Sequence, residues 1–138
     1  MAQAEPTWLQ MARRLATALD AEEYEAAGAC LAAACVYHSP AGVLAGPAAI
    51  IASYRASGAA GRKRFDAVEF DSFVESVGPG EVLVTYTDRV RLGEQSHEYR
   101  CRQRLRVGAG GLVEEIRHEE LPGERERLAA FETARGFP

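Results

Sequence analysis

The chain contains 138 residues, of which 47% are hydrophobic and 26% are charged. These values are typical of a soluble globular protein with a core of its own, so the sequence predicts a single domain over residues 1–138. The formal net charge of −4 argues against nucleic acid as the principal partner, because phosphate binding requires positive surface.

Three features of the sequence bear on its location. No apolar run approaches the roughly 18 residues of a membrane span. The opening residues MAQAEPTWLQ lack the basic and apolar regions of a signal peptide. The cysteines Cys30, Cys35 and Cys101 are odd in number and lack metal-type spacing. We therefore expect reduced thiols in a cytoplasmic protein with no membrane partner.

The first part of the chain predicts two helices. Apolar residues spaced four, three and four apart form one stripe along a helix over about residues 7–19. The members of this stripe are Trp8, Ala12, Leu15 and Leu19. Asp20 with Glu23 three positions later resembles a capping box, which predicts the start of a second helix.

A short strand and a third helix are expected next. Residues 35–39, with the sequence CVYHS, are typical of a strand. Pro47 marks the helix start, because proline at the first helical position loses no required N–H. This helix is expected to fray through residues 57–61, and residues 62–64 are expected to form a solvated loop.

The stretch from residue 65 to residue 120 predicts four strands. A strand over residues 65–77 precedes three more, EVLVTYTDRVRL, SHEYRCRQRLRV and GLVEEIRHEEL, separated by glycine-containing turns. A final helix is expected over residues 122–135. Helices on one side of an antiparallel sheet give an α+β fold class.

The last three strands alternate between two faces of different character. One face collects arginines interleaved with glutamates, which is typical of a solvated or subunit-facing surface with cross-strand pairs. The other is mostly apolar and carries some ionisable groups. Its members are Val84, Tyr86, Asp88, Tyr99, Cys101, Gln103, Leu105, Ile116, His118 and Glu120. Because charged groups are rarely buried without partners, this mixture predicts a lined pocket.

His118 is the strongest candidate for chemistry on that face, since an unperturbed imidazole titrates near neutral pH. Asp88 would accept a hydrogen bond from one ring nitrogen and orient the other towards a substrate. The alternative for His118 is a structural histidine bonded to a tyrosine. A purely structural role is also open for Asp88.

Other side chains are candidates for ligand contact. Tyr54, Tyr86 and Tyr99 offer amphipathic walls with a hydroxyl donor, although core packing is the alternative for each. Glu120 is expected near the pocket mouth. His38 faces the pocket only if a bulge or a one-residue slip exchanges the faces of its strand. The histidines show no HxH or HExxH spacing, so we expect no metal and no cofactor.

The order of elements resembles the nuclear transport factor 2-like superfamily, which includes SnoaL-like polyketide cyclases, ketosteroid isomerases, scytalone dehydratases and limonene epoxide hydrolases. The most specific segments are LDAEEYEAA, CVYHSPAGVLAGPAAIIASYR and GGLVEEIRHEELPGERERLAAF, and the resemblance covers nearly the whole chain. It implies a cone, in which helices close a strongly bent antiparallel sheet around an apolar pocket. It also implies a homodimer through the outer sheet face.

Comparison residue by residue argues against a steroid isomerase of the familiar kind. Ser39 stands where that group has its general base, and Leu15 and Gln103 stand at its two oxyanion-hole positions. Tyr54 matches a pocket tyrosine on the third helix.

Other members of the superfamily match to different degrees. Limonene epoxide hydrolases place an Asp-Arg-Asp set inside the cone, whereas the arginines here are expected to face outward. A scytalone-dehydratase-like set of His, Asp and tyrosines is closer in residue type, but its motif does not match position by position. SnoaL-like cyclases use a pocket acid–base residue on the later strands, a role open to Asp88, His118 or Glu120.

The sequence therefore predicts cofactor-independent acid–base chemistry on a small, mostly apolar, oxygenated molecule: an isomerisation, a dehydration or a cyclisation. His118 would act as base or acid, and Gln103 or a tyrosine would stabilise the developing enolate oxygen. Further expected ligand contacts are Tyr54, Tyr86, Tyr99, Gln103, Glu120, His38, Ile116 and Leu15. Two alternatives stay open. One is a non-catalytic ligand-binding or interaction module. The other is an acidic partner docked on the arginine-rich face, unless Glu69, Glu115 and Glu119 neutralise that face.

Overall fold

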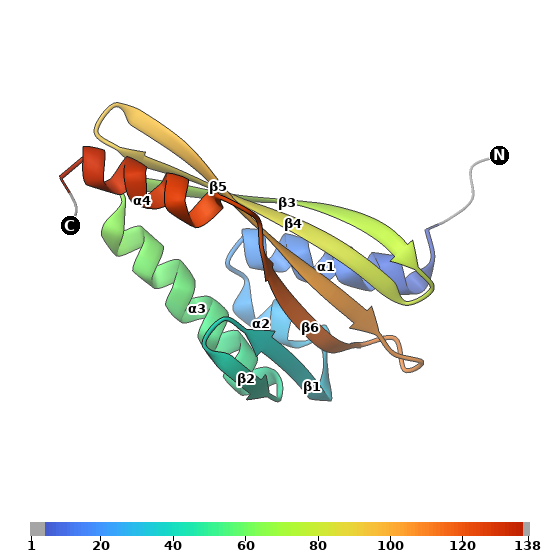
Figure 1. Cartoon of the computed structure of the whole chain (residues 1–138). Coiled ribbons are helices and arrows are strands. Elements are labelled where there is room, and N and C mark those ends of the chain that lie inside the picture. The colour runs from blue at the N-terminus through green and yellow to red at the C-terminus, as the bar shows by residue number, and fades with distance from the viewer. Residues whose placement is uncertain (1–4, 137–138) are drawn as a thin grey trace.

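The computed structural model describes residues 5–136, which fold into one six-stranded sheet and four helices (Figure 1). The helices are α1 (Thr7–Asp20), α2 (Tyr24–Gly28), α3 (Pro47–Arg64) and α4 (Glu124–Ala134). The strands are β1 (Leu31–Ser39), β2 (Gly42–Ala45), β3 (Ala67–Gly78), β4 (Glu81–Leu92), β5 (Gln95–Val107) and β6 (Val113–Glu120). The predicted α+β class is confirmed.

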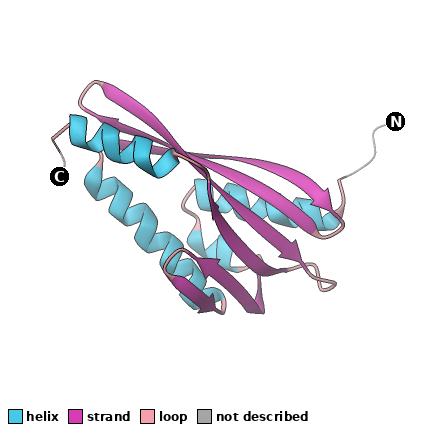
Figure 2. Ribbon diagram, in the orientation of Figure 1, coloured by secondary structure: helices cyan, strands magenta, loops and turns pink. Residues whose placement is uncertain are grey.

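The sheet has the order β2-β1-β6-β5-β4-β3, and every neighbouring pair is antiparallel except β1 and β6. It is strongly curved and does not close on itself, as the long twisted strands in Figure 2 show. Helices α1 and α3 contact the sheet from its concave side, and α4 lies along β5 near the β4–β5 turn. The curvature leaves space between the helices and the sheet.

The core forms where the predicted stripe of α1 meets the sheet. Leu15 of α1 and Ile50 of α3 are fully buried. They belong to the same apolar cluster as Val84, Leu105 and Ile116 of the concave sheet face. The helix prediction is confirmed to within one residue at its end. Because the alternation of β4, β5 and β6 places these residues inward, the core and the pocket share one sheet face.

The structure contains one strand that was not predicted, and two local predictions are wrong. Residues 42–45 form a strand, β2, which pairs with the end of β1. Helix α3 continues through residues 57–64, so the predicted fraying and the solvated loop at 62–64 are wrong. Ion pairs of Arg62 with Glu22 and of Arg64 with Glu132 hold its last turn. Basic residues at a helix C-terminus also interact favourably with the helix dipole.

The predicted capping box is also wrong. Asp20 is the last residue of α1, and α2 begins at Tyr24 without a side-chain cap. The Asp20 carboxylate instead accepts a hydrogen bond from Ser72 of β3. Asp20 therefore reaches across to the sheet rather than along the chain.

The outward sheet face carries the predicted arginines and acidic residues in cross-strand pairs. Arg104 of β5 lies 3.6 Å from Glu119 of β6, and Arg89 of β4 lies 3.5 Å from Glu98 of β5. Glu69, which we expected to take part, forms no ion pair within residues 5–136. Phe73 of β3 interrupts this charged surface with a side chain that is 65% exposed.

Helix α4 covers the part of β5 that extends beyond the end of β6. Glu124 Oε1 accepts a hydrogen bond from the backbone N–H of Arg100 at 3.0 Å, which satisfies a donor on this open edge. His97 of β5 stacks on Phe131 of α4, with 5.2 Å between the ring centroids. The start of α4 thereby places Arg125 beside the space enclosed by the sheet.

Candidate functional site

A cavity of about 400 Å³ lies between the helices and the concave face of the sheet. All five tyrosines of the chain line it. They are Tyr24, Tyr37, Tyr54, Tyr86 and Tyr99. Polar groups reach the same cavity from α1, β1, β4, β5, β6 and α4, so the fold collects side chains that are far apart in sequence. Such a cavity, mostly apolar with a few polar groups, is typical of small-molecule sites.

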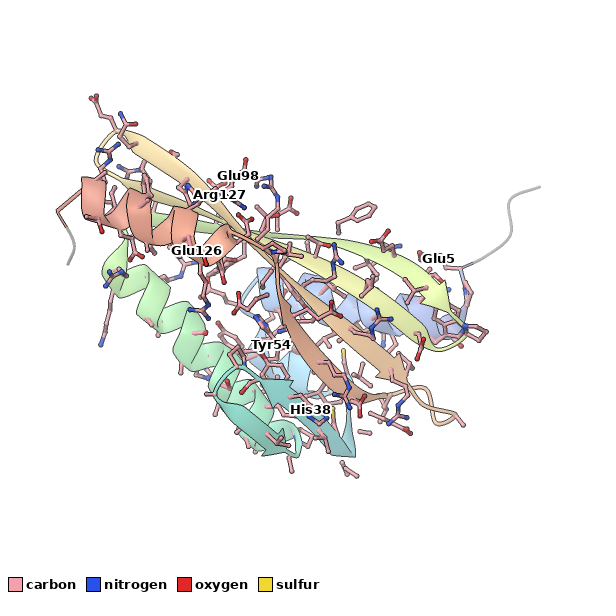
Figure 3. The ribbon with its side chains drawn as sticks, in the orientation of Figure 1. Glu5, His38, Tyr54, Glu98, Glu126 and Arg127 are labelled. Carbon is pink, nitrogen blue, oxygen red and sulfur yellow. The ribbon has the colours of Figure 1, made fainter. Side chains whose placement is uncertain are left out.

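A buried hydrogen-bond network crosses one end of the cavity, centred on Gln103. Tyr54 points from α3 towards the sheet (Figure 3) and donates to Gln103 Oε1 at 2.6 Å. Gln103 Nε2 donates to the Tyr37 hydroxyl at 3.1 Å and lies 3.5 Å from His118 Nδ1. Tyr37 and Tyr54 also stack with ring centroids 5.4 Å apart.

The other nitrogen of His118 is engaged too. His118 Nε2 lies 3.2 Å from Glu120 Oε1. Because the Gln103 amide is a donor, Nδ1 acts as an acceptor and Nε2 carries the hydrogen that Glu120 accepts. Both ring nitrogens therefore have protein partners. Among the described residues no hydrogen bond joins His118 to Asp88, so the predicted orientation of His118 by Asp88 is not present.

Glu120 connects this network to the cavity mouth. It accepts two hydrogen bonds from Arg125, at 3.0 and 2.9 Å, and one from the Tyr99 hydroxyl at 3.0 Å. Burial acts to raise the pKa of Glu120, but the hydrogen bonds from Arg125 and Tyr99 outweigh it and hold that pKa below its usual value. Glu120 is therefore a carboxylate near neutral pH, paired with Arg125.

Asp88 lies at the end of the cavity away from Gln103, whose register partner on β4 is Val84, and it differs from Glu120 in its partners. It projects from β4 into the cavity, opposite Phe70 on one side and Tyr99 on the other. Within residues 5–136 its carboxyl group has no hydrogen-bond or ion-pair partner. Burial, with a smaller contribution from the Asp20 charge, raises the pKa of Asp88 to about 6. An acid of this strength exchanges protons readily near neutral pH.

Two more polar groups lie at the Asp88 end without full hydrogen bonding. Asp20 Oδ2 accepts from the Ser72 hydroxyl at 2.5 Å, but Asp20 Oδ1 is buried and has no partner in the described part of the chain. The buried hydroxyl of Tyr86 has none there either. Unsatisfied buried polar groups are uncommon in folded proteins and point to a ligand, a proton or a water.

The structure brings most of the predicted site residues together. Asp88, His118, Tyr54, Tyr86, Tyr99 and Gln103 line the cavity. Glu120 stands at the mouth, bonded to Tyr99 and Arg125.

Three predicted contacts do not reach the cavity. Leu15 and Ile116 are fully buried in the core, where the inner sheet face packs on α1. His38 faces the outer surface, 3.7 Å from Glu115. The register irregularity of β1 lies upstream, between Leu31 and Val36, so it does not turn His38 inward. Ser39, on the alternate face, lines the cavity.

Among the lining residues that the sequence reasoning missed are Asp20, Tyr24, Tyr37 and Arg125. Tyr37 was within reach, because it shares the face of Ser39 in an alternating strand. Asp20 was assigned to a helix cap. No local signal indicates that Arg125, on the exposed first turn of α4, turns towards the cavity.

Comparison with known proteins gives the family. The sequence profile of the SnoaL-like domain matches residues 12–116, which is most of the chain. The chain belongs to the SnoaL-like family. No curated protein matches this SnoaL-like chain significantly in sequence.

Solved structures share the fold of this SnoaL-like chain at low sequence identity. A putative polyketide cyclase from Xanthomonas campestris pv. campestris superposes with a TM-score of 0.67 at 14% identity, covering 89% of this chain and 95% of the other. Rv0760c from Mycobacterium tuberculosis, in complex with estradiol-17β-hemisuccinate, has a TM-score of 0.65 at 18% identity, with coverages of 87% and 98%. An M. tuberculosis LEH-like epoxide hydrolase has a TM-score of 0.65 at 15% identity, with coverages of 93% and 88%. The predicted nuclear transport factor 2-like fold is confirmed. Within residues 5–136 no helix is long and apolar enough to cross a membrane.

Proposed function

We propose that the chain binds a small, mostly apolar, oxygenated molecule in its cavity and performs acid–base chemistry on it without a cofactor. The reaction class is an isomerisation, a dehydration or a cyclisation. One observation carries the proposal: Asp88 is a mostly buried carboxyl group without a partner among the described residues, its pKa is about 6, and it faces a cavity walled by tyrosines.

Asp88 rather than His118 is the better proton acceptor. A base needs a free lone pair within reach of the substrate, and both nitrogens of His118 already face protein partners. In an isomerisation the Asp88 carboxylate would take a proton from a carbon next to a carbonyl group. The C–H electron pair would move to the carbonyl oxygen as an enolate, and protonated Asp88 would return the proton to a second carbon.

Tyr37 is a donor that is available for the enolate oxygen. Its hydroxyl oxygen accepts from Gln103 Nε2, which leaves the hydroxyl hydrogen for a ligand. Burial raises the pKa of Tyr37 to about 12, so the hydroxyl keeps that hydrogen at neutral pH. Gln103, which the sequence suggested for this role, already directs its amide at Tyr37 and His118. A donor fixed by such a network loses little energy to reorganisation.

Native mass spectrometry of the purified protein is the first experiment, because it reports subunit number and any retained small molecule together. A retained apolar, oxygenated compound is expected, and it becomes the substrate for turnover assays with wild type and Asp88→Asn. Turnover that Asp88→Asn abolishes while binding persists supports the proposal. Turnover equal in both proteins contradicts the role of Asp88.

The rival function is ligand binding without turnover. The closed network around Gln103 favours it, since a satisfied buried network gives a rigid, shaped wall whether or not a reaction occurs. The similar protein Rv0760c is in complex with an estradiol derivative, which supports a polycyclic ligand for this chain. On this alternative a ligand raises the melting temperature, and its chemical structure stays unchanged in the presence of the wild-type protein.

We also propose a homodimer through the outer sheet face. Phe73 is a large apolar side chain exposed on that face, and the surrounding charges pair with one another rather than forming one basic patch. This pairing argues against an acidic partner docked on the arginines. Sedimentation of wild type as a dimer and of Phe73→Glu as a monomer is expected. A monomeric wild type would overturn this assembly.

A further inference from the structure

Asp20 enters the cavity from the helix side, close to Asp88. Its Oδ2 is bonded to the Ser72 hydroxyl, and Ser72 lies directly opposite Tyr86 in the β3–β4 register. Asp88 follows Tyr86 by two positions on the same strand, so both side chains point to the same face. The C-terminus of α1 thus holds one carboxyl group beside the strand that carries the other.

In the part of the chain that the structure describes, no cation lowers the pKa of either acid. The lining includes the guanidinium group of Arg125, but it is bound to the Glu120 carboxylate. Asp20 Oδ1 is buried without a partner in the described chain, and so is the Tyr86 hydroxyl beside it. Two carboxylates in a poorly solvated site do not readily ionise together, so one of them keeps its proton to higher pH.

We propose that Asp20 is a positioning residue for Asp88, and that the two carboxyl groups titrate as a coupled pair that holds one proton in mildly acidic to neutral solution. The cavity then contains an acid and a base at once. This inference rests on the proposed function only for its chemical consequence, which is that Asp20 sets the proton affinity of the group that meets the substrate.

The electrostatics of the surrounding groups agree with a coupled pair. Burial and then the Asp20 charge raise the pKa of Asp88, and burial raises the pKa of Asp20, which the Ser72 hydroxyl partly offsets. The titratable and charged groups that face the cavity from the other elements are Tyr24, Tyr37, Tyr54, Tyr99, Cys101, His118 and Arg125. Burial raises the pKa of these four tyrosines and of Cys101, so these groups are neutral near pH 6. The charge of Asp71 on β3 adds to the rise in the pKa of Asp20. His118 and Arg125 are both engaged by Glu120.

The test is a pH titration of the side-chain carboxyl carbons by carbon-13 NMR in wild type and in Asp20→Asn. Replacing the carboxyl group by an amide of the same shape removes the neighbouring charge, so the Asp88 midpoint is expected to fall by about one unit. Glu75→Gln is the matched control, because it removes an exposed acid from the outer face of β3. The Asp88 midpoint in this control is expected to equal that of wild type.

Coupling between two titrating groups is reciprocal, so the midpoint of Asp20 provides a second measurement. In Asp88→Asn the Asp20 midpoint is expected to fall by the same amount as the Asp88 midpoint falls in Asp20→Asn. The variant Ser72→Ala tests the coupling while both carboxyl groups remain in place. Without the hydroxyl that stabilises its charge, Asp20 holds its proton more firmly, and the Asp88 midpoint again falls.

An Asp88 midpoint that is unchanged in Asp20→Asn and in Ser72→Ala overturns the coupled pair. The titration needs no substrate, so its outcome is separate from that of the turnover assays. A shifted midpoint without any turnover would leave the pair standing and remove the proposed reaction. An unshifted Asp88 midpoint in a protein that turns over its ligand would remove the coupled pair and leave the proposed reaction standing.

Discussion

The two ends of the cavity are built from similar residue types but are satisfied to different degrees. At one end, Gln103 and His118 bond to Tyr37, Tyr54 and Glu120, and each polar atom of the amide has a partner. At the other, Asp88 has none among the described residues, and Asp20 and Tyr86 each keep a buried oxygen without one. A satisfied network stabilises one arrangement, whereas unsatisfied groups are free to exchange protons or to bind a ligand.

This difference changes the role that we assign to His118. Sequence reasoning favours His118 because imidazole titrates near neutral pH. In the folded chain burial brings an aspartate into the same range, while the histidine is held by its neighbours. Environment rather than residue type therefore decides which group is available for acid–base chemistry.

The strongest test of the comparison is the rate of turnover of a retained ligand in Asp88→Asn. Because the amide cannot accept a proton from carbon, kcat is expected to fall roughly 100-fold or more, with ligand affinity little changed. Steady-state kinetics with the wild-type protein as reference measure this. Parallel losses in kcat and in binding would mean that Asp88 holds the ligand rather than moves a proton.

The raised pKa of Asp88 should also change how the free energy of unfolding depends on pH. Folding raises the pKa of Asp88 from 3.8 to about 6. The stabilisation that results is therefore complete below pH 4 and is lost as pH rises through 6. Between pH 4 and pH 8 the free energy of unfolding of wild type should fall by up to about 3 kcal/mol relative to that of Asp88→Asn. Urea denaturation of both proteins at the two pH values gives the difference. Curves that stay parallel would place the Asp88 pKa near its ordinary value.

At the Gln103 end of the cavity, by contrast, a substitution should destabilise the protein. Gln103→Leu removes the partner of two buried tyrosine hydroxyls and is expected to destabilise the fold by about 2 kcal/mol, lowering the melting temperature by about 6 °C. Gln95→Leu, at the exposed start of β5, is the control and should change little. A Gln103→Leu protein as stable as wild type would show that the network does not hold the structure together.

The smallest effect is expected for His118→Gln. Glutamine can replace a donor and an acceptor, so we expect a loss of about 1 kcal/mol in stability and less than about a tenfold change in kcat. Thermal denaturation and turnover are measured on the same sample. A fall in kcat as large as that of Asp88→Asn would return the catalytic role to His118.

Periodicity predicted the larger part of the fold. The apolar stripe with Leu15 placed α1 on the core, and the alternation of β4, β5 and β6 gathered Asp88, Gln103 and His118 on one face. Both signals are local and repeat over many residues, so a single irregular position does not obscure them.

What the sequence did not predict depends on contacts between distant segments. Asp20 and Glu23 have the spacing of a cap, but Ser72, 52 residues away, takes the Asp20 carboxylate instead. The basic residues 62–64 look like a loop until Glu22 and Glu132 pair with them. Whether a polar side chain is satisfied, as His118 is and Asp88 is not, depends on such contacts and cannot be inferred from spacing.

The most direct test of the account is the carbon-13 titration of Asp88 in the wild-type protein, followed at its side-chain carboxyl carbon. The structure predicts a midpoint near 6, because the group is mostly buried, has no partner among residues 5–136 and lies near a second acid. A midpoint near 4, the value of an exposed or well-partnered aspartate, would contradict the claim that this end of the cavity holds the proton-exchanging group.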